Sequence, residues 1–337
     1  MSARLFGVGI GGAALTEAER EILRRDPPWG VILFQRNIET ASQLSALVAD
    51  LKTLPGPPVL CLDQEGGPVD RLKGVLGRTI SFHAAARAGA ARRAGELAGE
   101  SCRQFGFDVD LAPVVDRGLP DAGALVLGER CAAAEPDRIE RAAREFLEGL
   151  HASGIGGCLK HFPGLGRARL DTHKSLPRLD PDPQEELLDL EPFERLMDAA
   201  GAVMISHAAR RDGVPASLSR EAATRLLRGG LGFQGAAFSD DLEMGALSAF
   251  GDLPTRAAGA SLAGCDLLFV CKQIEAYPDC VDTVHRRVPP RRRAEAARRL
   301  QLYRRHLEMV RELAAPALRP IEELAADIAE LQSQTAD

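Results

Sequence analysis

The sequence predicts an α/β fold, a (β/α)8 barrel of the TIM type in a single domain with a C-terminal helical extension. Eight short runs of almost entirely apolar residues recur along the chain, which is typical of parallel strands buried on both faces. Stretches rich in Ala, Leu, Arg and Glu separate these runs. The chain has 337 residues, of which 45% are hydrophobic. This is enough for one barrel of roughly 250 residues with insertions.

Most of the apolar runs have Gly or Pro close by, which indicates strand ends. The expected strands are Leu5–Ile10, Gly30–Phe34, Val59–Asp63, Val109–Ala112, Gly157–His161, Val203–His207, Gly235–Ser239 and Asp266–Val270. The expected helices between them include Ala41–Thr53, Ala84–Phe105, Pro136–Ala152, Gln184–Ala199, Arg220–Arg228 and Thr255–Ala263. Eight alternations favour a closed barrel over an open doubly wound sheet, and no G-x-G-x-x-G motif leads from the first strand into a helix.

The C-terminal part of the chain has a different pattern. We assign residues 1–290 to the barrel catalytic domain and residues 291–337 to a helical extension of the same domain. The extension is expected to form two helices separated by Pro316 and Pro320, packed outside the barrel or at an interface. A basic run at 286–305 has helical spacing, which favours a solvated helix face over a nucleic-acid patch.

Composition excludes several classes of partner. The formal net charge is −6 and only 4% of the residues are aromatic, so nucleic-acid binding is not expected. The seven cysteines form no C-x-x-C pair, which argues against a disulfide framework or a zinc site. The N-terminus lacks a signal-peptide pattern, and no apolar run reaches about 18 residues. We therefore expect a cytoplasmic protein with no membrane partner.

Charged residues follow several of the expected strands. Asp63-Gln64-Glu65 ends the third strand, Lys160-His161 the fifth, Ser206-His207 the sixth and Ser239-Asp240-Asp241 the seventh. Because the carboxyl ends of barrel strands meet on one rim, these side chains are expected to converge. Burying ionised groups costs several kcal/mol unless they are paired, so a set of them predicts a functional cleft rather than a structural core.

The residue types narrow the chemistry of this cleft. The sequence has no H-E-x-x-H or H-x-H metal pattern, no G-x-S-x-G elbow and no phosphate-binding loop. Neither a metal nor a cofactor is expected. What remains is a nucleophile with acid/base catalysis on a polar, neutral small molecule, and glycoside hydrolysis is a common form of it.

Three motifs resemble family 3 glycoside hydrolases, most of all the bacterial NagZ-type β-N-acetylglucosaminidases. They are DQEGGPVDRL at 63–72, KHFPGLG at 160–166 followed by Asp171-Thr172-His173, and SDDLEMGA at 239–246. The resemblance continues in ILFQRN at 32–37, LAPVVD at 111–116 and ASLS at 216–219, so it runs in order along nearly the whole chain. The D-[ST]-H unit distinguishes this subfamily from family 3 β-glucosidases, whose acid/base is a carboxylate elsewhere.

The resemblance implies a retaining hydrolase that removes terminal β-N-acetylglucosamine, with muropeptide fragments as substrate and a monomer as the working form. Asp240 would be the nucleophile, and Asp171 would orient His173 as the acid/base. The positions that would contact the sugar are Asp63, Arg71, Arg130, Lys160 and His161. Asp241, the neighbour of the nucleophile, is expected to point the other way along the strand and to have a structural role.

Three departures from the family pattern lie beside the sugar-contacting positions. Leu165 stands where the motif usually has His, Pro68 replaces the usual Arg of E-G-G-R-V, and Cys131-Ala132-Ala133 replaces a Ser-Phe pair. They leave open an altered specificity or a non-catalytic sugar-binding protein. A phosphorylase also stays open, because some members with a His acid/base transfer the sugar to phosphate. A metal-dependent hydrolase is the last alternative, which a chelator would reveal.

Overall fold

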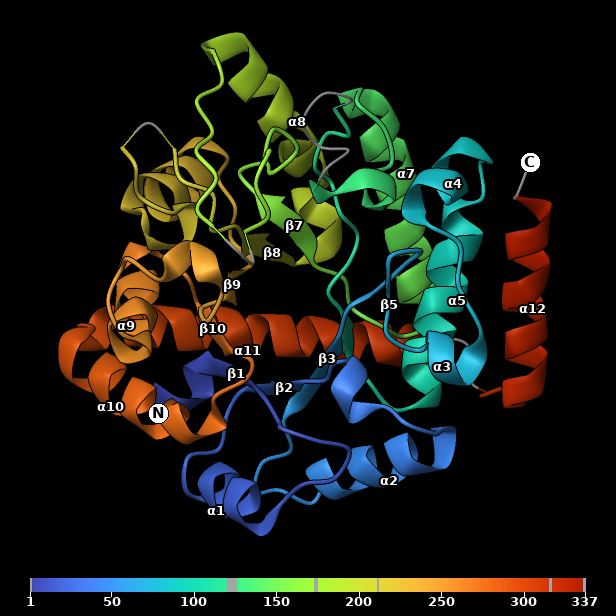
Figure 1. Ribbon diagram of the computed structural model, residues 1–337, viewed down its shortest axis with the longest axis horizontal. Helices are drawn as coiled ribbons and strands as arrows, with labels where there is room; N and C mark the ends of the chain where they lie inside the picture. The colour runs from blue at the N-terminus through green and yellow to red at the C-terminus, as the bar shows by residue number, and fades with distance from the viewer. Residues whose placement is uncertain (1, 120–125, 173–174, 211, 315–316, 336–337) are drawn as a thin grey trace.

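The computed structural model describes residues 2–119, 126–172, 175–210, 212–314 and 317–335. Within these ranges, eight parallel strands form one sheet in the order β6-β3-β2-β1-β10-β9-β8-β7 (Figure 1). They are β1 (Phe6–Gly9), β2 (Gly30–Ile32), β3 (Val59–Leu62), β6 (Val109–Asp110), β7 (Leu159–Phe162), β8 (Ala202–Ile205), β9 (Ala236–Asp241) and β10 (Leu267–Val270). Isolated parallel bridges, Val109–Gly156 and Val114–Lys160, join the two ends of this order. All eight predicted strands are found, and the predicted (β/α)8 fold is confirmed.

The strands that come first and last along the chain, β1 and β10, lie next to each other. Gly7 in β1 pairs with Gly30 in β2 on one side and with Phe269 in β10 on the other. A Cβ atom at Gly7 would lie 2.4 Å from the Phe269 ring, so only glycine leaves space for that ring. A short antiparallel hairpin, β4 (Gln64–Gly66) with β5 (Val69–Asp70), follows β3 and lies outside the ring of strands.

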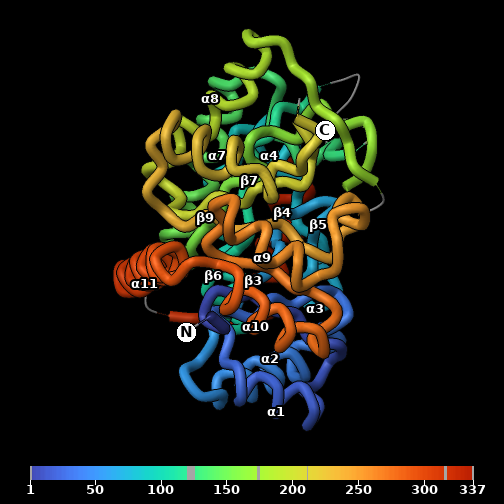
Figure 2. Tube along the Cα trace, turned by 90° about the vertical axis from the view of Figure 1, so that its left-hand side faces the viewer, coloured from blue at the N-terminus to red at the C-terminus, as the bar shows by residue number. Residues whose placement is uncertain are grey.

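Helices cover the outside of the sheet (Figures 1 and 2). They are α1 (Glu17–Arg25), α2 (Ala41–Leu51), α3 (Lys73–Leu76), α4 (Phe82–Arg87), α5 (Ala91–Gln104), α7 (Pro136–Ala152), α8 (Pro183–Ala200), α9 (Leu253–Ala263), α10 (Tyr277–Arg287), α11 (Pro290–Leu313) and α12 (Ile321–Gln334). Short 3-10 helices are η1 (Ser2–Leu5), η2 (Gln35–Asn37), η3 (Gly128–Arg130), η4 (Ala216–Leu218), η6 (Gly245–Leu247) and η7 (Ile274–Ala276).

Two of the expected helices differ from the prediction. The helix expected at Ala84–Phe105 is divided into α4 and α5, because Gly89 between them has a φ of 66°, in the left-handed region. The helix expected at Arg220–Arg228 is wound as a π-helix, η5 (Glu221–Gly230). The other four expected helices correspond to α2, α7, α8 and α9.

Helix α11 closes the N-terminal end of the barrel. Tyr303 stacks on Trp29 with ring centroids 6.1 Å apart, and its hydroxyl donates to the Gly157 carbonyl at 2.8 Å. Arg292 and Arg299 of the same helix contact the buried carboxylate of Asp266 at 2.9 and 3.4 Å. The prediction of a solvated face for the basic run is therefore wrong at these two positions. The helix turns them inward because Asp266, directly before β10, is buried inside the barrel and needs cationic partners.

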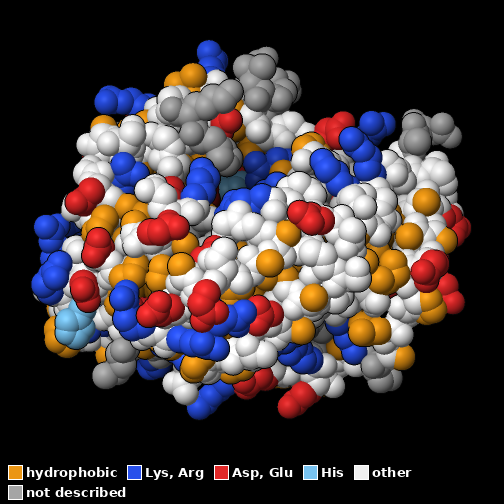
Figure 3. Space-filling model, turned by 60° about the horizontal axis from the view of Figure 1, so that its bottom comes forward, with side chains coloured by type: hydrophobic (Ala, Val, Ile, Leu, Met, Phe, Trp, Pro, Cys, Tyr) orange, Lys and Arg blue, Asp and Glu red, His pale blue; other side chains and the backbone are white. Residues whose placement is uncertain are grey.

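The surface of the molecule mixes charges of both signs. Figure 3 shows Lys, Arg, Asp and Glu side chains interspersed over the face it draws, with Lys and Arg gathering beside a hollow. In the part of the chain that the structure describes, none of the helices combines the length and apolar character needed to cross a membrane.

Candidate active site

The C-terminal ends of the barrel strands open into a cavity of about 440 Å³. Its lining comprises Ile32, Phe34, Arg36, Asp63, Glu65, Pro68, Val69, Arg71, Leu111, Val126, Arg130, Lys160, His161, Leu165, Asp171, Thr172, Met204, Asp240, Asp241, Met244, Phe269, Cys271 and Lys272. The volume falls in the range of pockets that bind small molecules. The cavity brings together Asp63, Arg71, Arg130, Lys160, His161, Asp171 and Asp240, seven of the eight predicted site residues. The eighth, His173, lies outside the described residues.

The base of the cavity is a network of buried ion pairs. Lys160 is 2% exposed, and its Nζ lies 2.9 Å from Asp63 Oδ1 and 2.5 Å from Glu65 Oε1. Arg130 holds both oxygens of Glu65, through Nε at 2.7 Å and Nη2 at 2.9 Å. Arg71 Nη2 approaches Asp63 Oδ2 at 3.4 Å. Such charge-assisted bonds fix each side chain in one orientation.

The network keeps its members ionised at neutral pH. Burial alone would raise the pKa of Asp63, but the charges of Lys160 and Arg71 outweigh it and hold this pKa well below its ordinary range. Burial likewise opposes ionisation of Glu65, yet Arg130 and Lys160 lower its pKa to about 2. Burial would lower the pKa of Lys160, but Asp63 and Glu65 raise it above its ordinary value. Fixed donors and acceptors of this kind suit the hydroxyl groups of a sugar.

The hairpin after β3 positions two of these groups. Gly66 and Gly67 have positive φ values, and a Cβ at Gly66 would lie 2.0 Å from the Ile80 carbonyl oxygen. Gln64 Oε1 accepts hydrogen bonds from the backbone nitrogens of Arg71 and Leu72, both at 3.1 Å. The glycines of the DQEGG segment therefore permit the tight turn, and the Gln64 side chain holds the backbone of Arg71 where its guanidinium can contact Asp63.

Two polar contacts hold the ring of His161 in place. Its Nδ1 donates to Asp116 Oδ2 at 2.7 Å, and its Nε2 accepts from Arg130 Nη2 at 3.3 Å. This pattern of bonds places the ring proton on Nδ1. Asp116 Oδ1 also accepts from the Leu165 backbone nitrogen at 2.6 Å, which ties the KHFPGLG loop to β7. The sequence analysis placed Glu65 among the converging strand ends but gave neither Glu65 nor Asp116 a specific role, although both stand in the quoted motifs.

Two β-bulges turn consecutive side chains toward the cavity. Between β9 and β10, Phe238 pairs with Leu267 but Asp241 pairs with Phe269, so β9 contains one extra residue. Between β7 and β8, Leu159 pairs with Val203 and Phe162 with Ile205, which is the same irregularity. A bulge interrupts the alternation of side chains along a strand. As a result both Lys160 and His161, and both Asp240 and Asp241, line the cavity.

The expectation that Asp241 points away from the cavity is therefore wrong. Asp241 Oδ1 accepts from the Glu243 backbone nitrogen at 3.0 Å, and its side chain is 16% exposed. Burial, together with the charges of Glu243 and Asp240, raises its pKa to about 6. His207, another predicted strand end, does not line the cavity. Its Nδ1 lies 2.7 Å from the Ser217 hydroxyl and its Nε2 lies 2.7 Å from the Asp241 carbonyl oxygen. His207 therefore fixes the backbone at the end of β9.

The three departures from the family pattern differ in their placement. Leu165 is 2% exposed and lines the cavity, packed in an apolar cluster with Val114, Leu127 and Cys131. Pro68 lines the cavity at its exposed edge. Cys131 is buried and lines a neighbouring cavity of about 480 Å³ instead. Leu165 and Pro68 can thus meet a substrate directly, whereas Cys131 acts only through the loop that carries Arg130.

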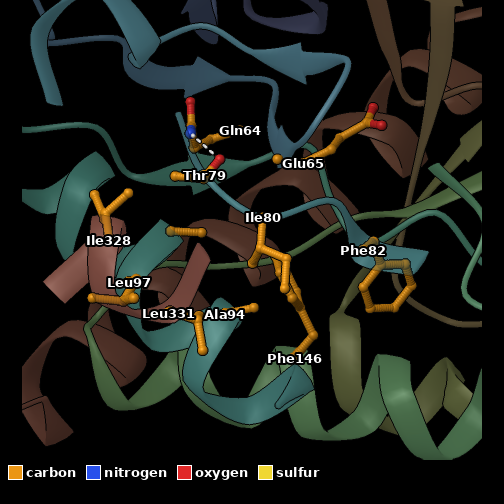
Figure 4. A pocket seen from close by; sticks show the side chains of 12 residues that line it. Gln64, Glu65, Thr79, Ile80, Phe82, Ala94, Leu97, Phe146, Ile328 and Leu331 are labelled. Atoms are coloured by element: carbon orange, nitrogen blue, oxygen red, sulfur yellow. Dashed lines mark hydrogen bonds between the residues drawn. The ribbon is translucent and has the colours of Figure 1, made fainter. Parts of the chain in front are cut away.

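A much smaller apolar pocket lies behind the β4–β5 hairpin (Figure 4). Ile328 and Leu331 of α12 meet Leu97 of α5 and Phe146 of α7 there, while Gln64 and Glu65 form the opposite side. The pocket shows how α12 packs on α5, outside the barrel. Across the residues that the structure describes, no group of three or more His, Cys, Asp or Glu side chains is arranged to hold a metal ion.

A barrel whose strand ends gather carboxylates, cations and an imidazole around one cavity has the groups that a barrel glycosidase needs. Comparison with known proteins makes the class specific. Residues 5–301 match the model of the glycosyl hydrolase family 3 N terminal domain. The chain belongs to glycosyl hydrolase family 3, and it is a glycoside hydrolase.

Individual relatives cover most of the chain. A beta-hexosaminidase from Pseudomonas aeruginosa (strain LESB58) is 37% identical over 270 residues, which is 78% of this chain and 80% of the relative. A beta-hexosaminidase from Tolumonas auensis is 36% identical over 300 residues, 85% of this chain and 88% of the relative. NagZ from Neisseria gonorrhoeae, solved with N-trifluoroacetyl-D-glucosamine, superposes with a TM-score of 0.81 at 28% identity and covers 98% of both chains.

Proposed function

We propose that this protein is a retaining β-N-acetylglucosaminidase that releases terminal, non-reducing N-acetylglucosamine. The observation that carries the proposal is the convergence of Asp240, Asp171 and the Asp63–Lys160–Glu65 network on one cavity. The ionised network at the base supplies fixed partners for sugar hydroxyls, and Asp240 lies on the same lining as these groups. The names of the relatives, beta-hexosaminidase and NagZ, support the same substrate class.

The proposed reaction has two steps. First, a carboxylate oxygen of Asp240 bonds to the anomeric carbon while the bond to the aglycone oxygen breaks, and His173 gives that oxygen its proton. Asp171, which lines the cavity, would fix the tautomer of His173 and stabilise its imidazolium. Second, His173 takes a proton from water, the water oxygen bonds to the anomeric carbon, and Asp240 leaves as a carboxylate. Two inversions give net retention.

The natural setting follows from the family resemblance and from the cysteines. Muropeptide fragments are the proposed substrates, and a monomer is the proposed working form. All seven cysteines are buried and free, which supports a reducing, cytoplasmic compartment. Burial raises the pKa values of all seven thiols. They therefore stay protonated and behave as small apolar residues.

The test is release of 4-nitrophenol from 4-nitrophenyl β-N-acetylglucosaminide. Asp240→Asn is expected to reduce kcat by about 10⁴-fold or more, because it removes the nucleophile. His173→Ala is expected to reduce kcat by about 10²- to 10⁴-fold, the usual contribution of a general acid. Asp279→Asn on the exposed side of α10 serves as the control and should match the wild type. Full activity in Asp240→Asn would refute the assignment.

A further inference from the structure

Two exposed cations line the cavity in addition to those of its buried base. Arg36, in η2 after β2, and Lys272, two residues after the end of β10, are both exposed and both line the cavity. Lys160 and Arg130, by contrast, lie at the base and are 2% and 17% exposed. Arg36 and Lys272 therefore stand on the solvent side of the lining, and we place the aglycone of a sugar bound at the base on this side.

Arg36 is held in place by three elements. Its Nε donates to the Ile10 carbonyl at 3.0 Å, and its Nη2 donates to the Cys271 carbonyl. Its guanidinium carbon lies 4.7 Å from the centre of the Phe34 ring. At Gly9 a Cβ would lie 2.0 Å from the Cys271 carbonyl oxygen and 3.0 Å from Arg36 Nη2. The glycine thus leaves space for Arg36 to reach across β1 to the end of β10, next to Lys272.

The charges of these two residues are poorly neutralised. Among the described residues, no carboxylate lies within ion-pair distance of Arg36, whose polar partners are backbone carbonyls. Lys272 Nζ approaches Asp241 Oδ2 at 4.0 Å, the weakest kind of pair. At the base, each of Lys160, Arg71 and Arg130 has a carboxylate partner. A fixed guanidinium without a carboxylate is a typical recognition group for an anion.

We propose that Arg36 and Lys272 form an anion subsite at the mouth of the cavity, which binds a negatively charged group beside the anomeric carbon. This proposal rests on the proposed glycosidase function and names the charge of the group beyond the sugar. Two sources have the required chemistry: a carboxylate on the aglycone, and inorganic phosphate as an acceptor. In the second case a phosphate oxygen bonds to the anomeric carbon, Asp240 leaves as a carboxylate, and the product is the sugar 1-phosphate.

The first arm of the test compares two aryl β-N-acetylglucosaminides that differ only in a carboxylate or a carboxamide on the ring. The ratio of their kcat/KM values is measured for the wild type, Arg36→Gln and Lys272→Gln. Each variant is expected to lower the ratio of kcat/KM for the carboxylate glycoside to that for the carboxamide glycoside about twofold to fivefold, which is the size of effect expected for an exposed charge pair. The change should come from a higher KM for the carboxylate glycoside. Arg36→Lys should keep part of the preference. Lys52→Gln, a lysine at another cavity, is the control.

The second arm adds inorganic phosphate and measures sugar 1-phosphate. If the wild type forms sugar 1-phosphate and Arg36→Gln and Lys272→Gln form less of it, phosphate is the occupant of the subsite. If only the ratio of the two kcat/KM values changes, the occupant is the carboxylate of the aglycone. The proposal is overturned if the ratio of the kcat/KM values is the same in the wild type and both variants, and if formation of sugar 1-phosphate also does not depend on Arg36 or Lys272. If neither glycoside turns over, the proposed function fails. Calorimetric binding of the two glycosides then still decides whether the charge is recognised.

Discussion

The two ends of the barrel both bury carboxylates among cations, yet only one of them is a candidate active site. At the N-terminal end, Asp266 is fully buried and lies 2.7 Å from Arg228, 2.9 Å from Arg292 and 3.4 Å from Arg299. At the C-terminal end, Asp63 and Glu65 share Lys160, Arg71 and Arg130. The first cluster is covered by α11, whereas the second faces a cavity of about 440 Å³.

The difference shows that buried charge alone does not identify a catalytic site. At Asp266 one carboxylate faces three guanidinium groups, and burial with this excess of positive charge lowers the pKa of Arg228 to about 10. The cluster joins α11 and η5 to β10, so its role is to hold the end of the barrel closed. At the other end the charges are nearly balanced and polar side chains remain accessible to a ligand.

Removing the charge at the closed end should give the largest effect on folding. Asp266→Asn leaves three arginines around a neutral side chain, and loss of one partner of a buried pair costs about 3–5 kcal/mol. We expect the free energy of unfolding in urea to fall by this amount, while kcat/KM of the folded protein stays near the wild-type value. Asp198→Asn, whose side chain is 76% exposed, is the control. A large loss of activity without loss of stability would contradict the contrast.

The matching substitution at the open end should mainly affect catalysis. Asp63→Asn removes an ionised acceptor from the base of the cavity, and kcat/KM for the aryl glycoside is expected to fall about 10²- to 10³-fold, as for other preorganised polar groups. The loss in free energy of unfolding should be smaller than for Asp266→Asn, because water can enter the cavity and Lys160 keeps Glu65 as a partner. Equal destabilisation by the two variants would remove the distinction between the ends.

The smallest effect concerns Asp110, which is buried in β6 below the cavity. Its Oδ1 accepts from the Gln64 backbone nitrogen at 2.9 Å, but its Oδ2 has no hydrogen-bond partner. Burial raises its pKa to about 8. Since the folded protein binds this proton more tightly than the unfolded chain does, stability should fall as pH rises from about 4 to about 8.

Asp110→Asn removes that dependence. Between pH 5 and pH 8.5, the free energy of unfolding in urea is expected to decrease less for the variant than for the wild type. At the higher pH the variant should be more stable than the wild type by on the order of 1–3 kcal/mol. Glu65 has the opposite sign, because its pKa is lowered to about 2 and its contribution to stability is lost as pH falls below about 4. A variant that follows the wild-type pH curve would show that Asp110 does not titrate in this range.

The fold and most of the candidate site could be predicted because both depend on local patterns. The eight strands were predicted from apolar runs of strand length with Gly and Pro at their ends. The charged residues directly after these runs predicted at which end of the barrel the cavity lies. Ion-pair partners from distant segments could not be predicted in this way. Asp116 reaches His161, and Asp266 reaches Arg299, only after the chain has folded.

Departures from ideal geometry account for the remaining errors. Asp241 was expected to face away because strand side chains alternate, but the bulge in β9 breaks the alternation there. Gly89 divides a helix whose composition otherwise favours continuity. Both features depend on one residue among many favourable neighbours, so a pattern averaged over a segment does not detect them.

The position of α11 also has a consequence for the order of assembly during synthesis. β1 leaves the ribosome first, but its partner β10 follows at residues 267–270, and α11 comes later still. Until then Trp29, Phe238 and Asp266 remain without Tyr303, Arg292 and Arg299. Until β10 and α11 are synthesised, a nascent chain therefore exposes one edge of β1 and these aromatic side chains, and such surfaces recruit chaperones or aggregate. Completion of the barrel therefore depends on α11, one of the last elements in the order of the chain.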